Sequence, residues 1–216
     1  MTEEEWFRAT DAELRTVMWR LDARRQRLLA AAVCRAMGPW VDYPAVHEAL
    51  SAVEIYADTG KTKAALRRAR QAVRALRNEL YQLHPRESWS DLALFAVQAA
   101  ASENAVFATI EDARRALASA EDIPVEEAGR RLFHPYRDIT AKPATLLSFP
   151  ALWHTDTTVL LAQQMYESRE FSAMPILADA LQDAGCDNED VLNHCRDPNQ
   201  VHVRGCWVVD LVLGKQ

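Results

Sequence analysis

The side chains best suited to chemistry lie close together near the C-terminus. Three of the four cysteines and two of the six histidines fall within 21 residues. Thiolates and imidazoles are the ligands of structural zinc sites, in which four protein ligands leave no open position on the metal. The candidate ligands of such a site are Cys186, Cys195, His202 and Cys206, with His194 as an alternative to Cys186.

The spacing of these residues also favours a plainer interpretation. The C-x2-C pair that is typical of zinc knuckles is absent. His194 and Cys195 are adjacent, and adjacent side chains on a helix point about 100° apart, so both can hardly bind one ion. The cysteines can equally be small buried hydrophobic residues, with the histidines bonded to backbone carbonyls.

The same cluster allows an enzymatic interpretation, in which a cysteine is the nucleophile. Cys195 or Cys206 would be activated by His202, and Asp187 or Asp210 would orient the imidazole ring. No local signature of a cysteine enzyme accompanies them. The chain also has no phosphate-binding glycine loop and no G-x-S-x-G, H-E-x-x-H or EF-hand motif. The sequence leaves catalysis open and favours a protein that is not an enzyme.

A second group of candidate residues lies on a predicted helix between residues 61 and 83. Its apolar residues follow helical 3-4 spacing, and a parallel basic stripe runs about 100° around the helix axis. The stripe consists of Lys63, Arg67, Arg70, Arg74 and Arg77. Residues 61–87 hold eight basic and two acidic side chains, a net charge of +6, although the whole chain carries −6.

The basic stripe has two interpretations. It is either a binding face for an acidic protein partner or for phosphate groups, or a solvated face whose arginines pair with acids of neighbouring helices. No aromatic residue is interleaved with it, no motif marks a groove-reading helix, and the chain is acidic overall. We therefore expect a protein partner, of unidentified nature, and no nucleic acid.

The elements that must position these residues are predicted to be helices throughout. Six glycines and nine prolines in 216 residues are too few for a turn-rich all-β protein. We predict an all-α fold with a multi-helix bundle over 1–133, an ordered proline-containing connector over 134–153 and a smaller helical unit over 154–216. The two units either are separate or share one core. In the last unit, helices near 156–168, 172–184, 188–195 and 205–213 would carry the Cys/His cluster.

The C-terminal segment also resembles a known group of proteins. The stretches MPILADALQDAGC (174–186), HCR (194–196) and HVRGCWVVDLVLGK (202–215) are similar to the closing segment of a large paralogous family of planctomycete-type bacterial proteins. The opening residues 1–6 and 27–35 are similar to the N-terminus of that family. Its members are labelled SMI1/KNR4-like or repeat-companion proteins and have no established activity. The resemblance implies a bacterial cytosolic protein and no particular function.

The sequence favours a non-enzymatic, helical interaction or accessory module. The alternative is a small enzyme or a zinc-stabilised domain that uses the C-terminal cluster, and no cofactor other than zinc is expected. A pocket for a small molecule, lined by Trp153, His154, Trp207 and the proline-containing connector, is a further interpretation. No apolar run is long enough to span a membrane, and no signal-peptide pattern opens the chain, so we expect a cytoplasmic protein without a membrane partner.

Overall fold

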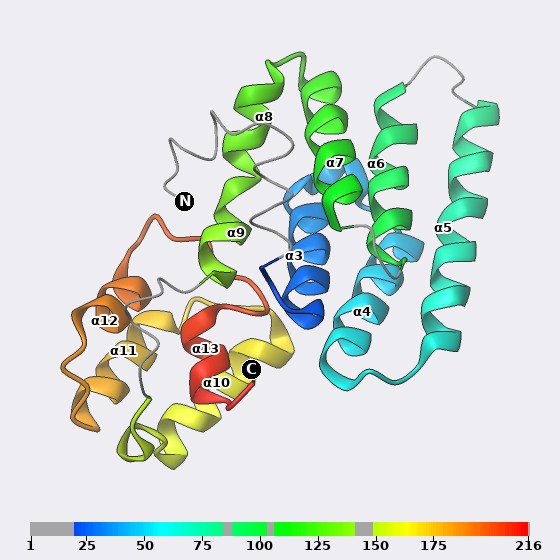
Figure 1. The fold of residues 1–216 in the computed structure, drawn as a ribbon. Helices are drawn as coiled ribbons and strands as arrows, with labels where there is room; N and C mark the ends of the chain where they lie inside the picture. The colour runs from blue at the N-terminus through cyan, green and yellow to red at the C-terminus, as the bar shows by residue number, and fades with distance from the viewer. Residues whose placement is uncertain (1–19, 84–87, 103–105, 141–148, 216) are drawn as a thin grey trace. The chain divides into compact units, whose positions relative to one another are not determined.

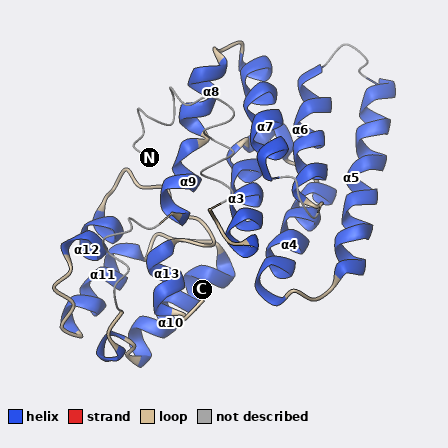
Figure 2. Cartoon of the chain, viewed as in Figure 1, coloured by secondary structure: helices blue, strands red, loops and turns tan. Residues whose placement is uncertain are grey.

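The computed structural model describes residues 20–83, 88–102, 106–140 and 149–215. Over these ranges every regular element is a helix and no strand is present, as Figure 2 shows. The expected all-α class is therefore confirmed. None of the described helices is both long and apolar enough to cross a bilayer.

The chain divides into two compact units, residues 1–133 and 134–216 (Figure 1). Within the first unit, α3 packs against α4, α6 and α7 through a continuous buried run from Leu28 to Cys34. The described helices of this unit are α3 (Ala23–Ala36), the short 3-10 helix η1 (Gly38–Val41), α4 (Pro44–Thr59), α5 (Lys63–Leu83), α6 (Ser88–Ala100), α7 (Val106–Glu121) and α8 (Val125–Arg131).

Helix ends in the first unit follow from local residue types. The Asp22 side chain accepts a hydrogen bond from the backbone N–H of Arg25 and caps α3. Pro44 stands in the first turn of α4, where a proline removes no helical hydrogen bond. Gly60 ends α4 with a left-handed φ of 63°, which glycine adopts without strain.

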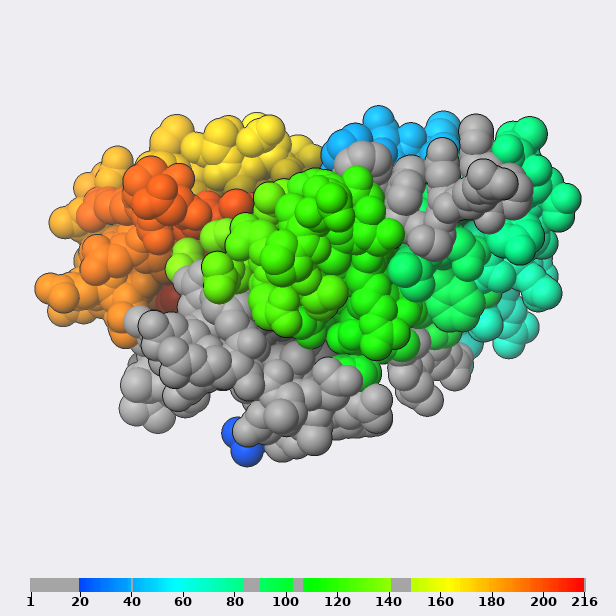
Figure 3. All heavy atoms as spheres, turned by 90° about the horizontal axis from the view of Figure 1, so that it is seen from above, coloured from blue at the N-terminus to red at the C-terminus, as the bar shows by residue number. Residues whose placement is uncertain are grey.

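The basic helix α5 lies at the outer edge of the first unit, next to α6 (Figure 3). It also packs against α4. Only Leu66 and Val73 are buried among its 21 residues. Most of the α5 surface is therefore free of contact with the other described helices of its unit.

The second unit consists of short helices around its own core. They are α9 (Phe133–Ile139), the 3-10 helix η3 (Ala151–Trp153), α10 (Asp156–Ser168), α11 (Met174–Asp183), α12 (Glu189–Arg196) and α13 (Trp207–Val212). Leu177, Leu181 and Leu192 are buried in one hydrophobic cluster with Trp207. Cys186, Cys195 and Cys206 belong to the same cluster, and the four cysteines of the chain are all free thiols.

The expected connector over 134–153 differs from the structure in one respect. Its first residues continue a helix, α9, that the sequence pattern does not predict. The His134-Pro135 pair belongs to a proline-containing stretch without periodicity, which favours a connector, but Pro135 stands in the first turn of α9, where proline is tolerated. Residues 141–148 of the expected connector lie outside the described residues.

Candidate metal centre

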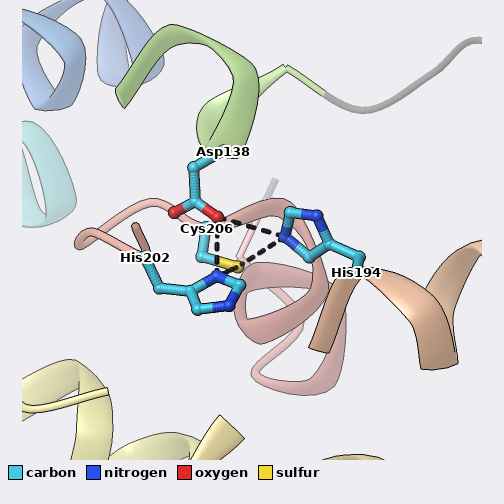
Figure 4. A group of neighbouring side chains, drawn as sticks. All are labelled: Asp138, His194, His202 and Cys206. Atoms are coloured by element: carbon cyan, nitrogen blue, oxygen red, sulfur yellow. Dashed lines mark hydrogen bonds and ion pairs between the residues drawn. The ribbon is translucent and has the colours of Figure 1, made fainter. Parts of the chain in front are cut away.

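Four side chains of the second unit converge on one point, as Figure 4 shows. Asp138 extends from α9 and His194 from the last turn of α12. His202 lies in the segment between α12 and α13, and Cys206 is the residue before α13. One carboxylate oxygen, two ring nitrogens and one sulfur all lie within 4.8 Å of one another.

The distances between these atoms resemble those of a metal coordination shell. Asp138 Oδ1 is 2.8 Å from His202 Nδ1 and 3.1 Å from His194 Nε2. Cys206 Sγ is 3.4 Å from His194 Nε2 and 3.7 Å from His202 Nδ1. Ligand atoms at the corners of a tetrahedron around zinc are about 3.3–3.8 Å apart, given bonds of about 2.0–2.3 Å. The two distances from Cys206 Sγ fall in this range, whereas the two from Asp138 Oδ1 are shorter and are those of hydrogen bonds.

The centre is withdrawn from water. The side chain of Asp138 is 0% exposed, that of His202 is 6% exposed and that of His194 is 11% exposed. Cys206 is fully buried. Burying polar and charged groups costs free energy unless they find partners, so this arrangement needs compensating contacts.

Asp138 is held as a carboxylate that faces both imidazole rings. Its Oδ2 accepts the backbone N–H of Val203 at 2.7 Å, which leaves Oδ1 for His194 and His202. Burial by itself raises the pKa of Asp138. The hydrogen bonds from the two histidines and their electrostatic attraction outweigh that effect, and the pKa lies below its ordinary value. The buried carboxyl group is therefore negatively charged at neutral pH.

Cys206 shows the opposite effect. Burial raises the pKa of its thiol well above the ordinary value, and the negative charge of Asp138 raises it further. A thiol in this position is protonated at neutral pH unless a cation is present. A bound divalent metal ion reverses the effect, because a coordinating thiol is deprotonated by the charge of the ion.

Backbone geometry places His194 and Cys206. The Asn188 side chain accepts the N–H of Val191 and caps α12, which carries His194. Gly205 has a φ of 98°, a value that residues with a Cβ rarely adopt. This turn directs Cys206 inward at the start of α13, where its carbonyl accepts the N–H of Asp210 at 2.8 Å.

The structure corrects the expected set of metal ligands. It brings His202 and Cys206 together with His194, but the other two candidates, Cys186 and Cys195, lie in the hydrophobic cluster outside the group. The reason at Cys195 is the rotation per residue of a helix: His194 faces the centre, so its neighbour is turned into the core, where it is 1% exposed.

Asp138 was not among the candidates from the sequence. It is 64 residues from His202, in a stretch without periodicity, and no spacing motif connects the two. Only the packing of α9 within the second unit brings its carboxylate to the cluster. A single aspartate at such a distance carries no signal that sequence reasoning can use.

Comparisons with known proteins were made at three levels. No family model, no curated protein and no solved structure matches the chain. The interpretation of the four side chains is based on their distances, burial and charge.

The geometry does not fit the nucleophilic-cysteine interpretation. In a Cys-His-Asp triad the histidine contacts the nucleophile with one ring nitrogen and the carboxylate with the other. Here His194 contacts both Asp138 and Cys206 through Nε2, and His202 contacts both through Nδ1. Four groups that converge through single atoms could hold a cation.

A pocket of about 570 Å³ adjoins the centre at its most exposed ligand. Its lining includes His194, Trp207, Arg137 and Arg196. Among the described residues, His154 and Trp207 line two different pockets, and Trp153 is buried in the core. Residues 141–148 of the connector expected to line the pocket lie outside the described residues.

The basic stripe is found on α5 as the sequence predicts. Lys63, Arg67, Arg70 and Arg74 are exposed. Arg77 is partly buried and forms an ion pair of 3.2 Å with Asp91 of α6, so the expectation that neighbouring acids neutralise the stripe holds at this residue.

Proposed function

We propose that residues 134–216 form a metal-stabilised helical unit and that its ion is zinc. A single observation carries the proposal: the ligand atoms of Asp138, His194, His202 and Cys206 lie within 4.8 Å of one another. In each imidazole ring, a single nitrogen faces this point and contacts both the carboxylate of Asp138 and the sulfur of Cys206.

The donor atoms favour zinc over other ions. One sulfur, two nitrogens and one oxygen suit a borderline-soft ion that accepts four ligands in a tetrahedron. Magnesium and calcium take six or more oxygen ligands and do not fit a site with a thiolate and two imidazoles. Two histidines and one carboxylate also occur in non-haem iron enzymes, but those sites keep open positions for their reactants. Here Cys206 takes a fourth position in a buried centre.

The number of protein ligands favours a structural role for the metal. A catalytic zinc keeps one position for water or substrate, whereas a structural zinc has four protein ligands. The four ligands here come from α9, α12, the following segment and the residue that opens α13. One ion therefore links four parts of a small unit whose core is made of short helices.

For the chain as a whole we propose a non-enzymatic interaction or accessory module of the bacterial cytosol, with a protein as its partner. The single-nitrogen contacts of His194 and His202 speak against the enzymatic alternative. The resemblance of residues 174–215 to a planctomycete-type family supports the cytosolic location.

The proposal is tested by measuring the metal content of untagged protein by mass spectrometry. We expect one zinc ion per chain in the wild type and almost none in His202→Gln or Asp138→Asn. Cys195→Ala is the matched control, since this cysteine is adjacent to His194 but outside the ligand group. The proposed site is contradicted if the wild type contains no zinc, if Cys195→Ala loses its zinc or if His202→Gln retains it. A stoichiometric metal other than zinc, such as copper, contradicts its chemistry.

A further inference from the structure

The arginines of the first unit are mostly neutralised by acids. Ion pairs join Arg24 to Asp58 and Arg35 to Glu54, each at 2.9 Å. On α7 and α8, further pairs are Arg115 with Glu111, Arg130 with Glu127 and Arg131 with Glu127. This pattern makes any row of unneutralised arginines in the same unit an exception.

Such a row lies on α5. Arg67, Arg70 and Arg74 share one helix face, extend over about 10 Å and are exposed. Within the described part of the chain, none of the three has a hydrogen bond or an ion pair. Like charges at i, i+3 and i+4 destabilise a helix, so the row carries a cost that no acid in the described residues offsets.

The row has the spacing of a helix-packing seam. Lys63, Arg67, Arg70, Arg74, Arg77 and Tyr81 follow one another at intervals of 4, 3, 4, 3 and 4 residues. This spacing places the six side chains along one face of the helix, where a second helix laid along α5 would meet all of them. It extends over about 27 Å of α5 and ends in Tyr81, which is 56% exposed. At the same end, Phe95 of α6 is 46% exposed, and Arg77 lies over its ring at 5.0 Å.

We propose that this face of α5 docks an acidic helix of a partner protein. Charge complementarity requires a partner whose carboxylates repeat every 3 to 4 residues, so that they oppose Arg67, Arg70 and Arg74 along the seam. Tyr81 and Phe95 give the end of the interface an aromatic contact, a residue class that is enriched in protein interfaces.

A protein helix fits this face better than a nucleic acid does. Residues 61–87 carry +6 in a chain of −6, so the remaining residues carry −12 and repel a polyanion. The two aromatic side chains, Tyr81 and Phe95, lie at one end of the face and are not interleaved with Arg67, Arg70 and Arg74, as the stacking of successive bases requires. A helix that contacts α5 alone meets the basic face and avoids most of the acidic surface.

The test uses two synthetic helical peptides of identical composition and a duplex and a single-stranded oligonucleotide. One peptide carries glutamates at 3-4 spacing on a single face, and the other carries them around the helix. We expect the one-face peptide to bind more tightly than the dispersed one, as measured by fluorescence anisotropy at low salt. Amide chemical-shift changes should map to α5, and affinity should fall as salt concentration rises.

Variants with equal changes in charge identify the interface. R67Q/R70Q/R74Q should weaken binding of the one-face peptide by about tenfold or more, because it removes three opposed charges. R68Q/R115Q/R130Q is the control, since Arg68 lies on another face of α5 and Arg115 and Arg130 lie on other helices. The control should change affinity by about twofold or less. Both variants alter exposed side chains only, so both should stay folded. R67Q/R70Q/R74Q should slightly raise the melting temperature, because it removes the repulsion within the row. The control should slightly lower it, because it removes two exposed ion pairs.

Three results would overturn the inference. The first is the absence of peptide binding to α5, and the second is equal affinity for the two peptides or equal loss in the two variants, which indicates unspecific charge attraction. The third is tighter binding of an oligonucleotide with the same dependence on Arg67, Arg70 and Arg74, which would assign the face to nucleic acid.

Discussion

His194 and Cys195 show how neighbouring residues of one helix serve different purposes. The ring of His194 faces the metal centre, while the thiol of Cys195 packs in the hydrophobic cluster. Burial raises the pKa of Cys195, as does the nearby charge of Asp138, so this thiol is protonated and suited to packing. Helix geometry prevents His194 and Cys195 from binding the same ion. The tertiary structure determines which of the two faces the candidate site.

Asp138 is the residue on which the centre depends most. Asp138→Asn keeps the size of the side chain and removes the charge that faces His194 and His202. We expect the free energy of unfolding of the variant to be about 3–5 kcal/mol lower than that of the wild type. Removing one member of a buried charged group leaves the other members buried without their partner. Urea denaturation measures this loss.

A surface aspartate of the same unit serves as the control for that change. Asp197 pairs with Arg137 at 3.7 Å, and its side chain is 40% exposed. Asp197→Asn should cost at most about 1 kcal/mol, as is usual for exposed ion pairs. Equal losses in the two variants would mean that Asp138 is no more than an ordinary ion-pair partner.

At the scale of the elements, the centre depends on turns between helices as much as on the helices themselves. Gly205 allows the chain to turn inward directly before Cys206, and Gly185 ends α11 with a φ of 87°. Pro135 in the first turn of α9 leaves the helix intact up to Asp138. These short-range features bring ligands from separate helices to one point.

Gly205→Ala tests whether the turn positions Cys206. The added Cβ disfavours a φ of 98° and should cost about 1–2 kcal/mol of unfolding free energy. Because the strain acts on the residue next to a ligand, zinc affinity, measured by competition with a chromophoric chelator, should also fall.

Gly214→Ala is the matched control for the turn. Gly214 has a φ of 62°, no atom lies within 4 Å of the Cβ it would gain, and no ligand of the centre adjoins it. It should lose comparable stability and keep the wild-type zinc affinity. Unchanged zinc affinity in Gly205→Ala would show that Cys206 is positioned without this turn.

At the scale of the whole molecule, helical periodicity and capping residues predict most of what is observed. The four C-terminal helices lie within two residues of their expected bounds, and the basic stripe of α5 is found where the 3-4 spacing puts it. The pattern fails at α9, where a proline in a first turn resembles a chain break. It also fails at the candidate metal centre, because Asp138 is distant in sequence and residue type alone does not separate Cys206 from the cysteines outside the group.

The most direct test of the central claim is X-ray absorption spectroscopy at the zinc edge on the native protein. A centre formed by Asp138, His194, His202 and Cys206 predicts one sulfur at about 2.3 Å and three nitrogen or oxygen ligands at about 2.0–2.2 Å. Two or three sulfur ligands would contradict this assignment and point to a site that includes Cys186 or Cys195. A shell of six oxygen and nitrogen ligands without sulfur would show that the four side chains do not hold the ion.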